Sequence, residues 1–273
     1  MNRLHLLAAS AASLLALSPS GAALLLHYDF NDGNATNKGT LANGTVAGGS
    51  TFVASGAGSN AGLAWSGNRT GANNAFINTG IAANALGYSA TGNYTSMAWI
   101  NWAGPSGSVD HMVFGQDDGM PAGNAAQVHH GIRVDTTAPN IHFGGWGGTQ
   151  DISDAGTVIV GVWTHVAWQF NQAGVGEAVV YINGVEVNRQ DKNNISDAAQ
   201  VLKTMLIGGH SRDGTALNPY HSFNGQLDDV RIYDTALTAA EIMTARNAVN
   251  IPEPSHLALV SLAALGLFQR RRR

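Results

Sequence analysis

Leu227-Asp228-Asp229-Val230-Arg231-Ile232-Tyr233-Asp234 has the composition of a β-strand with one face in a hydrophobic core. Val230 and Ile232 are β-branched and two positions apart, and alternate side chains of a strand share a face, so both are expected to face the core. The same two-residue period places Asp228 on the core side. A buried carboxylate must be paired, hydrogen-bonded or bound to a metal, because leaving it bare costs several kcal/mol. Asp228 is therefore the first candidate for a metal ligand.

Other short segments have the same strand character, being rich in β-branched or aromatic residues and bounded by Gly, Asn, Asp or Pro. They are Leu24–Phe30, Tyr94–Trp102, His111–Gly115, Val128–Val134, Trp163–Phe170, Ala178–Asn183 and Thr204–Gly208. Asn183-Gly184 accepts the positive φ values of a type I′ turn, which predicts a hairpin there. The stretch Gly33–Asn74 is rich in Gly, Asn, Ala and Thr, and we expect it to form loops between short edge strands.

One helix is predicted, late in the chain. Thr238 can cap its first turn while Glu241 reaches back three residues, and Ile242 and Ala245 share one face. With 34 glycines and only 12% charged residues, the composition is typical of β-sandwiches. We therefore predict an all-β, two-sheet antiparallel sandwich with one short C-terminal helix, flanked by a signal helix and a sorting helix at the two ends of the chain.

Three motifs carry a family resemblance. They are Trp163-Thr164-His165-Val166-Ala167, Val180-Tyr181-Ile182-Asn183-Gly184-Val185, and Phe223 to Tyr233 followed by Leu237 and Glu241-Ile242. In this order they resemble the laminin-G-like, concanavalin A-like jelly-roll superfamily over residues 26–247, and Tyr28 to Gly33 fits its first strand. The resemblance implies one jelly-roll domain over residues 24–248. It does not define a ligand, because the superfamily includes carbohydrate-binding modules, adhesion domains, lectins and hydrolases.

The resemblance also implies a structural calcium ion at Asp228. In related jelly rolls the equivalent Asp looks like a calcium ligand that joins the last strand to the first, with backbone carbonyls completing the oxygen shell. Calcium prefers oxygen ligands, and Asp29 and Asp32 add carboxylates near the first strand. The alternative is that Asp228 accepts backbone hydrogen bonds or pairs with an arginine, and that Asp29 and Asp32 are ordinary acids of a loop or strand end.

Hydrolase activity is not expected. Glycoside hydrolysis needs a general acid and a nucleophile or base roughly 5–10 Å apart. The chain has only three glutamates before its tail, Glu177, Glu186 and Glu241, and no Glu-x-Asp-x-x-Glu pattern. Asp228 and Asp229 are adjacent, so strand alternation predicts opposite faces for them. The sequence therefore predicts a protein without catalytic residues.

Trp146 is the candidate ligand-binding residue. It stands in Gly144-Gly145-Trp146-Gly147-Gly148, and an exposed indole in a flexible loop can stack on the apolar face of a sugar ring. The alternative is that Trp146 folds back and seals a sheet edge. On each of two other predicted strands, one tryptophan of the pairs Trp99/Trp102 and Trp163/Trp168 is expected on the outer sheet face, either as a binding platform or packed under a loop.

The N-terminal segment has the pattern of a signal peptide. Arg3 precedes the apolar stretch Leu4–Leu17, and Ser20-Gly21-Ala22 offers the small residues that signal peptidase requires. We therefore expect residues 1–22 to be removed on export. The absence of cysteine excludes a thiol nucleophile and fits an exported domain large enough to fold without disulfides.

The C-terminal segment has three parts in a fixed order. They are Ile251-Pro252-Glu253-Pro254-Ser255, the uncharged run His256–Phe268, and the basic tail Arg270–Arg273. The basic tail stays on the cytoplasmic side, so the preceding domain faces outward. The uncharged run is shorter than the roughly 20 residues of a stable span, which favours a cleaved tail over a permanent anchor. Residues 251–273 resemble the PEP-CTERM sorting signal of Gram-negative bacteria, with Pro252, Glu253 and Pro254 as its motif and an exosortase as the processing enzyme.

Charge restricts the partners. Arg3 and Arg270–Arg273 are five of the 14 basic residues, so nine basic residues remain against 18 acidic ones. Such a surface repels nucleic acid. We predict an exported binding or adhesion module of the cell surface or extracellular matrix, held transiently in the inner membrane by its C-terminal segment. Its link to glycans and to an exopolysaccharide-producing bacterium comes from the PEP-CTERM resemblance. The alternatives are a structural matrix protein without a ligand site and, less favoured, a jelly-roll glycoside hydrolase.

Overall fold

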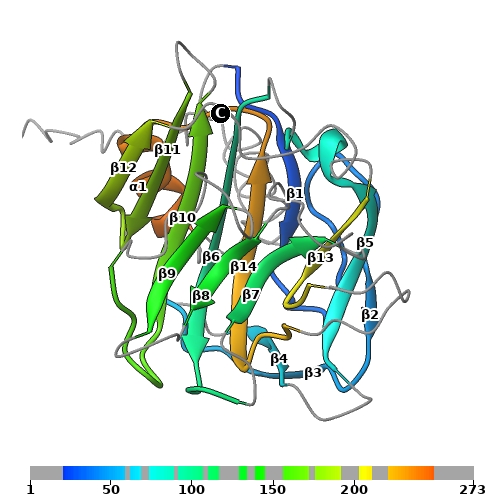
Figure 1. Ribbon diagram of the computed structural model, residues 1–273. Helices are drawn as coiled ribbons and strands as arrows, with labels where there is room; N and C mark the ends of the chain where they lie inside the picture. The colour runs from blue at the N-terminus through cyan, green and yellow to red at the C-terminus, as the bar shows by residue number, and fades with distance from the viewer. Residues whose placement is uncertain are drawn as a thin grey trace, which may run out of the picture.

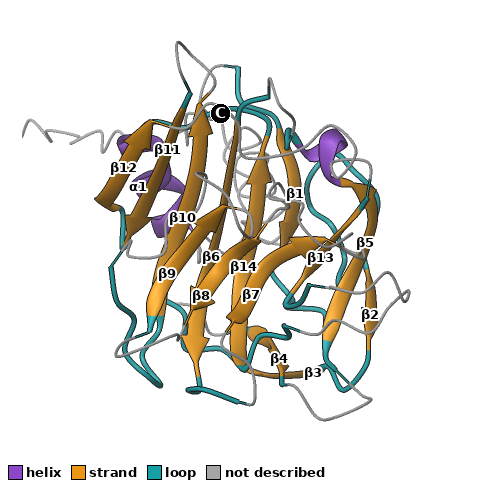
Figure 2. Cartoon of the chain, in the orientation of Figure 1, coloured by secondary structure: helices purple, strands orange, loops and turns teal. Residues whose placement is uncertain are grey.

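Two antiparallel β-sheets form the two layers of the molecule (Figure 1). The computed structural model describes residues 21–58, 62–68, 74–88, 92–106, 110–116, 129–133, 139–144, 156–171, 176–191, 203–210 and 221–248. In these residues strands predominate over helices (Figure 2). The predicted two-sheet antiparallel jelly-roll sandwich is confirmed. The signal segment up to residue 20 and the whole sorting segment, with Pro252, Glu253 and Pro254, lie outside the described residues.

The larger sheet has the strand order β12-β11-β10-β6-β14-β4-β3, and β1 also pairs with β14. Its strands, in that order, are β12 (Val185–Asp191), β11 (Glu177–Ile182), β10 (Thr164–Asn171), β6 (Tyr94–Trp102), β14 (Gly225–Tyr233), β4 (Leu63–Gly67), β3 (Thr51–Ala54) and β1 (Leu24–Tyr28). β14 is central, because β6 lines one of its edges while β4 and β1 share the other. β4 pairs with its first residues and β1 with its last.

The smaller sheet has the order β2-β5-β13-β7-β8-β9 and lies in front of the larger one in Figure 1. Its strands are β2 (Thr45–Ala47), β5 (Phe76–Ala82), β13 (Thr204–Ile207), β7 (Asp110–Gln116), β8 (His129–Arg133) and β9 (Asn140–Gly144). A short 3₁₀ turn, η1 (Ala83–Leu86), follows β5. Each predicted strand segment overlaps one of the observed strands, whereas β5 and β9 were not predicted. The predicted short strands within residues 33–74 are β2, β3 and β4.

The main core lies between the sheets and is rich in aromatic residues. Trp168 of β10 meets Phe114 of β7 edge to face, with ring centroids 5.6 Å apart. Such a pair contributes about 0.5–1.5 kcal/mol beyond the area that it buries. One polar contact also crosses the core, because the Tyr94 hydroxyl lies 3.0 Å from Nε2 of His130. His130 is stacked on Phe143 and buried.

Helix α1 (Ala239–Asn247) covers the outer face of the larger sheet. Its predicted capping box is present, because the Thr238 side chain accepts the Glu241 amide and the Glu241 carboxylate accepts the Thr238 amide at 2.7 Å. Ile242 and Ala245 pack into a second, smaller core with sheet residues that include Met97 of β6. Within the described part of the chain, none of the helices is long and apolar enough to cross a membrane.

The predicted hairpin is also present. Asn183 and Gly184 have φ values of 53° and 81°, the positive values that a type I′ turn requires, and β11 and β12 pair on either side of them.

β14 contains a β-bulge at Asp229. This residue has a φ of 48°, in the left-handed region. Asp228 lies opposite Trp99 of β6, but Arg231 lies opposite Met97, so two residues of β14 face one residue of β6. Because directly opposite residues share a face, and Met97 packs with α1, Asp228 and Arg231 lie on the outer face of the larger sheet.

The bulge overturns two orientations that strand alternation predicts. Leu227, rather than Asp228, joins Val230 and Ile232 in the core between the sheets. The prediction that Asp228 faces this core is therefore wrong, because the extra residue breaks the two-residue period. For the same reason Asp228 and Asp229 both lie on the outer face, and the prediction that they lie on opposite faces is also wrong.

Gly208, directly after β13, allows the core to close on Trp65. Its φ is +75°, and a Cβ atom at this position would lie 2.5 Å from the Trp65 ring. Gly80 in β5 has a similar φ of +67°, but a Cβ atom there would meet nothing within 4 Å. Alanine substitutions at the two glycines therefore distinguish the free-energy cost of a left-handed backbone from the cost of crowding the core.

We expect Gly208→Ala to lower the free energy of unfolding by roughly 2–4 kcal/mol, because it adds core crowding to the left-handed backbone cost. Gly80→Ala should lose only about 1–2 kcal/mol, from the backbone cost alone. Urea denaturation of both variants measures the difference. Equal losses in the two variants would show that Trp65 does not require Gly208.

Candidate functional site

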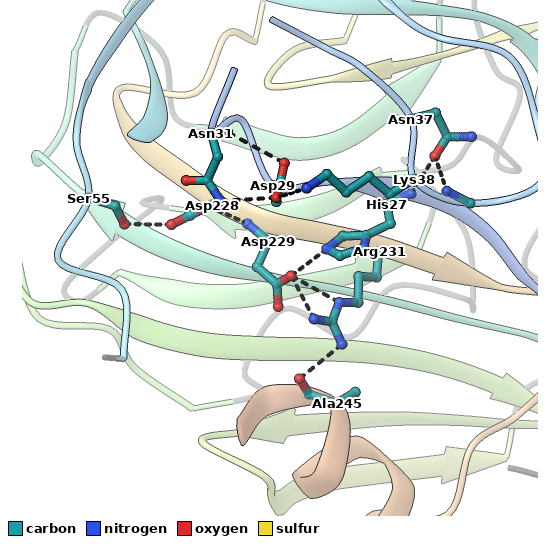
Figure 3. A network of polar contacts seen from close by, with 11 residues as sticks. His27, Asp29, Asn31, Asn37, Lys38, Ser55, Asp228, Asp229, Arg231 and Ala245 are labelled. Atoms are coloured by element: carbon teal, nitrogen blue, oxygen red, sulfur yellow. Dashed lines mark hydrogen bonds and ion pairs between the residues drawn. The ribbon is translucent and has the colours of Figure 1, made fainter. Parts of the chain in front are cut away.

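A group of polar side chains gathers on the outer face of the larger sheet, beside α1 (Figure 3). We call it the outer-face cluster. It brings together residues of β1, the loop after β1, the end of β3, and the bulge of β14. Its members are His27, Asp29, Asn31, Lys38, Ser55, Asp228, Asp229 and Arg231. Two of the three predicted metal ligands, Asp228 and Asp29, belong to it.

Asp228 is fully buried and accepts hydrogen bonds from within the protein. The Ser55 hydroxyl donates to Oδ2 at 2.5 Å, and the backbone amide of Asp229 donates to Oδ1 at 2.7 Å. These contacts correspond to the alternative in which Asp228 is satisfied by hydrogen bonds. The bulge makes them possible, because it turns Asp228 away from the inner core and toward the loop that contains Ser55.

Asp229 is the centre of a buried ionic network. Its Oδ1 atom accepts hydrogen bonds from His27 Nε2 at 2.7 Å and from Arg231 Nε at 2.9 Å. Burial alone would raise the pKa of Asp229, but Arg231 and His27 hold that pKa below its usual value. Arg231 also donates from Nη1 to the carbonyl of Ala245 at 3.0 Å. The carboxylate thus links β1, β14 and the last turn of α1.

Asp29 and Asp32 have separate, local partners. Asp29 forms an ion pair with Lys38 and accepts a hydrogen bond from Asn31 Nδ2 at 2.9 Å. Burial would raise the pKa of Asp29, but the contacts with Lys38 and Asn31 lower it below its usual value. Asp32 accepts the backbone amide of Asn34 at 3.0 Å, as loop aspartates often do.

These contacts bear on the predicted calcium ion. In the described residues no three His, Asp or Glu side chains form a group that could hold a metal. Asp228, Asp29 and Asp32 each bind a different protein donor, and Lys38 places a positive charge beside Asp29. The three carboxylates therefore do not fit a shared calcium cage. Calcium at Asp228 alone, completed by backbone carbonyls, stays a prediction of the family resemblance.

Other acidic residues also have structural roles. Glu177 and Glu186 both bind Arg189 on the exposed surface of β11 and β12, at 2.7 and 2.8 Å. Glu241 caps α1. Although Asp228 and Asp229 share a face, both are buried and hydrogen-bonded to protein donors, so neither presents a carboxylate to solvent. Asp228 and Asp229 therefore do not form an exposed acid pair, and the absence of catalytic residues stays a prediction.

Two residues next to this cluster, His165 and Arg246, were not predicted as site residues. His165 lies directly opposite Trp99 on neighbouring strands, with ring centroids 5.5 Å apart. Arg246 of α1 places its guanidinium carbon 5.1 Å from the centroid of the Trp99 ring. Burial lowers the pKa of His165 to about 3. From the sequence, strand alternation indicates that one of Trp99 and Trp102 faces outward. The contact between His165 and Trp99 could not be predicted, because it depends on the register between β6 and β10.

The predicted ligand residue, Trp146, lies outside the described residues. Of the pair Trp163/Trp168, Trp168 faces the core, and Trp163, just before β10, is partly exposed and lies against the loop at Gly56. Of the pair Trp99/Trp102, the outer-face residue is Trp99, which is only 5% exposed. It is packed beneath Arg246 and the loop at Gly58, where a Cβ atom would lie 3.2 Å from its ring. Trp99 therefore fits the packed alternative rather than a platform for a ligand.

The family can be assigned from the sequence as a whole. A family model described as the concanavalin A-like lectin/glucanases superfamily, Laminin_G_3, matches residues 73–243. The chain belongs to this superfamily. The match includes β6, β10 and β14, and therefore the bulge and its neighbours. No curated protein matches the chain.

Several solved structures share the fold of this chain. Domain 4 of AbnA, an extracellular GH43 arabinanase from Geobacillus stearothermophilus in complex with arabinotriose, is 19% identical with a TM-score of 0.58, over 82% of this chain and 98% of that one. The binding domain of Paraclostridial Mosquitocidal Protein 1 is 14% identical with a TM-score of 0.55, over 83% and 52%. The botulinum neurotoxin DC binding domain in complex with SialylT is 14% identical with a TM-score of 0.52, over 84% and 52%.

We expect Asp229→Ala to lower the free energy of unfolding by about 3–5 kcal/mol, because it leaves Arg231 buried without its carboxylate. The matched variant Asp29→Ala removes the partly exposed pair with Lys38 and should cost about 1 kcal/mol or less. Urea denaturation at neutral pH compares the two. A similar, small loss in both variants would contradict a central role for Asp229.

Proposed function

We propose that this protein is an exported, non-catalytic module that binds glycans at the cell surface or in the extracellular matrix. The proposal is supported by membership of a superfamily that contains lectins. It is also supported by the shared fold of the AbnA domain, which was solved with arabinotriose, and of the neurotoxin domain, which was solved with SialylT. These two structures are only 19% and 14% identical to the chain, so they show a shared fold and not a shared ligand. Glycan binding by this chain is therefore part of the proposal.

The proposal of binding without catalysis rests on the burial and the ion pairs of the described acidic residues. Superfamily members also include glucanases, and glycoside hydrolysis needs two accessible carboxyl groups across the scissile bond. Asp228 and Asp229 are 0% and 2% exposed and serve the bulge, and Glu177 and Glu186 neutralise Arg189. Binding without bond cleavage therefore fits these residues better than hydrolysis.

We assign the glycan contact to Trp146. Trp99, Trp102 and Trp168 are at most 5% exposed, and Trp163, which is partly exposed, lies against the loop at Gly56. Trp146 stands between two pairs of glycines, a sequence that leaves an indole accessible to the apolar face of a sugar ring.

Export and sorting complete the proposal. Signal peptidase would remove residues 1–22, and the segment 256–268 would hold the protein in the inner membrane until an exosortase recognises Pro252-Glu253-Pro254. A polysaccharide or matrix partner suits the acidic, Lys- and Arg-poor domain better than nucleic acid does. The proposed final location is the surface or matrix of a Gram-negative bacterium.

A glycan array with the processed protein tests the binding function. We expect saturable binding to at least one glycan, with arabino-oligosaccharides and sialylated glycans on the array. Trp146→Ala should weaken it about tenfold or more, equivalent to about 1.4 kcal/mol. Arg189→Ala, on the exposed surface of β12, serves as the control and should leave binding unchanged.

Absence of binding by the unaltered protein would favour a structural matrix protein. Cleavage of a β-glucan, lost when one acidic residue is neutralised, would favour a hydrolase.

Mass spectrometry of the protein purified from the native cell surface tests export. We expect an N-terminus directly after Ala22 or Ala23 and the loss of residues 256–273. Changing Pro252, Glu253 and Pro254 together to alanine should leave the C-terminal segment attached and the protein in the inner membrane, while Asn250→Ala should be processed normally. Full-length protein that accumulates in the cytosol with both ends uncut would refute the assignment.

A further inference from the structure

Five buried polar atoms next to the outer-face cluster have no hydrogen-bond partner among the described residues. They are Nδ1 and Nε2 of His165, Nε1 of Trp99, Oδ2 of Asp229 and Nε of Arg246. An unsatisfied buried donor or acceptor costs about 1–3 kcal/mol, and such atoms are rare in native proteins. Five of them beside one cluster therefore point to a bound molecule that satisfies most of them.

The four residues lie close together. His165 and Trp99 are paired across β10 and β6, and Asp228, the neighbour of Asp229 in the chain, lies opposite Trp99 on β14. Arg246 approaches the same Trp99 ring from α1. The charges of both Asp229 and Arg246 act on His165. We call Trp99, His165, Asp229 and Arg246 the subhelical site.

The five polar atoms of the subhelical site are shielded from bulk solvent, although the Arg246 side chain as a whole is only partly buried. Trp99, His165 and Asp229 are 5%, 0% and 2% exposed. The loop at Gly58 packs on Trp99, and the last turn of α1 packs above Arg231 through the Ala245 carbonyl. In Figure 3 one oxygen of Asp229 carries all the contacts to His27 and Arg231, and the second oxygen carries none. This second oxygen is the acceptor that the subhelical site offers.

The hydrogen-bonding capacities of the site define its ligand. Nε1 of Trp99 and Nε of Arg246 are donors, and a neutral His165 supplies one donor and one acceptor. With Oδ2 of Asp229, the site offers three donors and two acceptors. Chloride or another simple anion cannot donate to Asp229 or to His165, and a metal cation would meet the positive charge of Arg246 and the N–H groups of Trp99 and His165. Water both donates and accepts, and two to four polar partners are what a buried water molecule requires.

We propose that the subhelical site binds ordered water, which bridges α1 to β6, β10 and β14. The water donates to Asp229 Oδ2 and to the unprotonated nitrogen of His165, and it accepts hydrogen bonds from Trp99 and Arg246. A bridge of this kind is enthalpically close to a direct hydrogen bond. It supplements the direct link between Arg231 and Ala245, so that the C-terminal half of the helix is held by polar contacts as well as by Ile242 and Ala245.

A high-resolution crystal structure of the whole processed protein tests this proposal. We expect a water oxygen within about 3.2 Å of Asp229 Oδ2 and of at least two of the nitrogen atoms. A dry site, direct bonds among the four side chains, or a bound chloride would each overturn the proposal.

Amide hydrogen exchange gives an independent test in solution. His165→Phe and Trp99→Phe each remove polar partners of the water, so exchange of the α1 amides should accelerate at least tenfold relative to the amides of β6 and β10. Trp65→Phe is the control, because Nε1 of Trp65 also lacks a partner but lies in the core between the sheets, away from α1. If no water is bound, His165→Phe removes two orphaned atoms at similar size and should leave α1 exchange unchanged or slower. Should His165→Phe fail to fold, Trp99→Phe decides.

Discussion

The buried ion pair of Asp229 and Arg231 organises the outer half of this molecule. Two charged groups that are 2% and 6% exposed are expensive to remove from water, and their attraction compensates only when the remaining hydrogen-bonding atoms are also satisfied. Here His27 of the first strand and the Ala245 carbonyl of the helix provide those contacts. One carboxylate therefore holds together elements from both ends of the domain.

The bulge gives this carboxylate its position. In a regular strand Asp228 and Asp229 would point to opposite faces, and one of them would enter the apolar core. The left-handed conformation of Asp229, which aspartate tolerates better than most residues, turns both side chains outward and returns Val230 and Ile232 to the core. The outer face of the larger sheet is consequently polar near β14 and apolar under α1, where Met97 and Ile242 meet.

Features that depend on neighbouring residues could be predicted from the sequence. The hairpin at Asn183-Gly184 and the capping box of Thr238 and Glu241 are local, and both are confirmed. The bulge could not be predicted, because Asp229 has no glycine or other local signal for a left-handed backbone. Sequence alone shows that Asp228 needs a partner, but not that the partner is Ser55, 173 residues away. For the same reason the contact of His165 with Trp99 depends on strand register, which sequence patterns do not contain.

The pairing of β1 with β14 also governs when the domain can form. His27 and Asp229 are 202 residues apart in the chain, so the central strand of the larger sheet completes its edge only after almost the whole domain has been synthesised. Contacts of such high sequence separation slow folding, because a long loop must close before they form. Until the last strand has been synthesised, the edge of β14 that β1 covers cannot form.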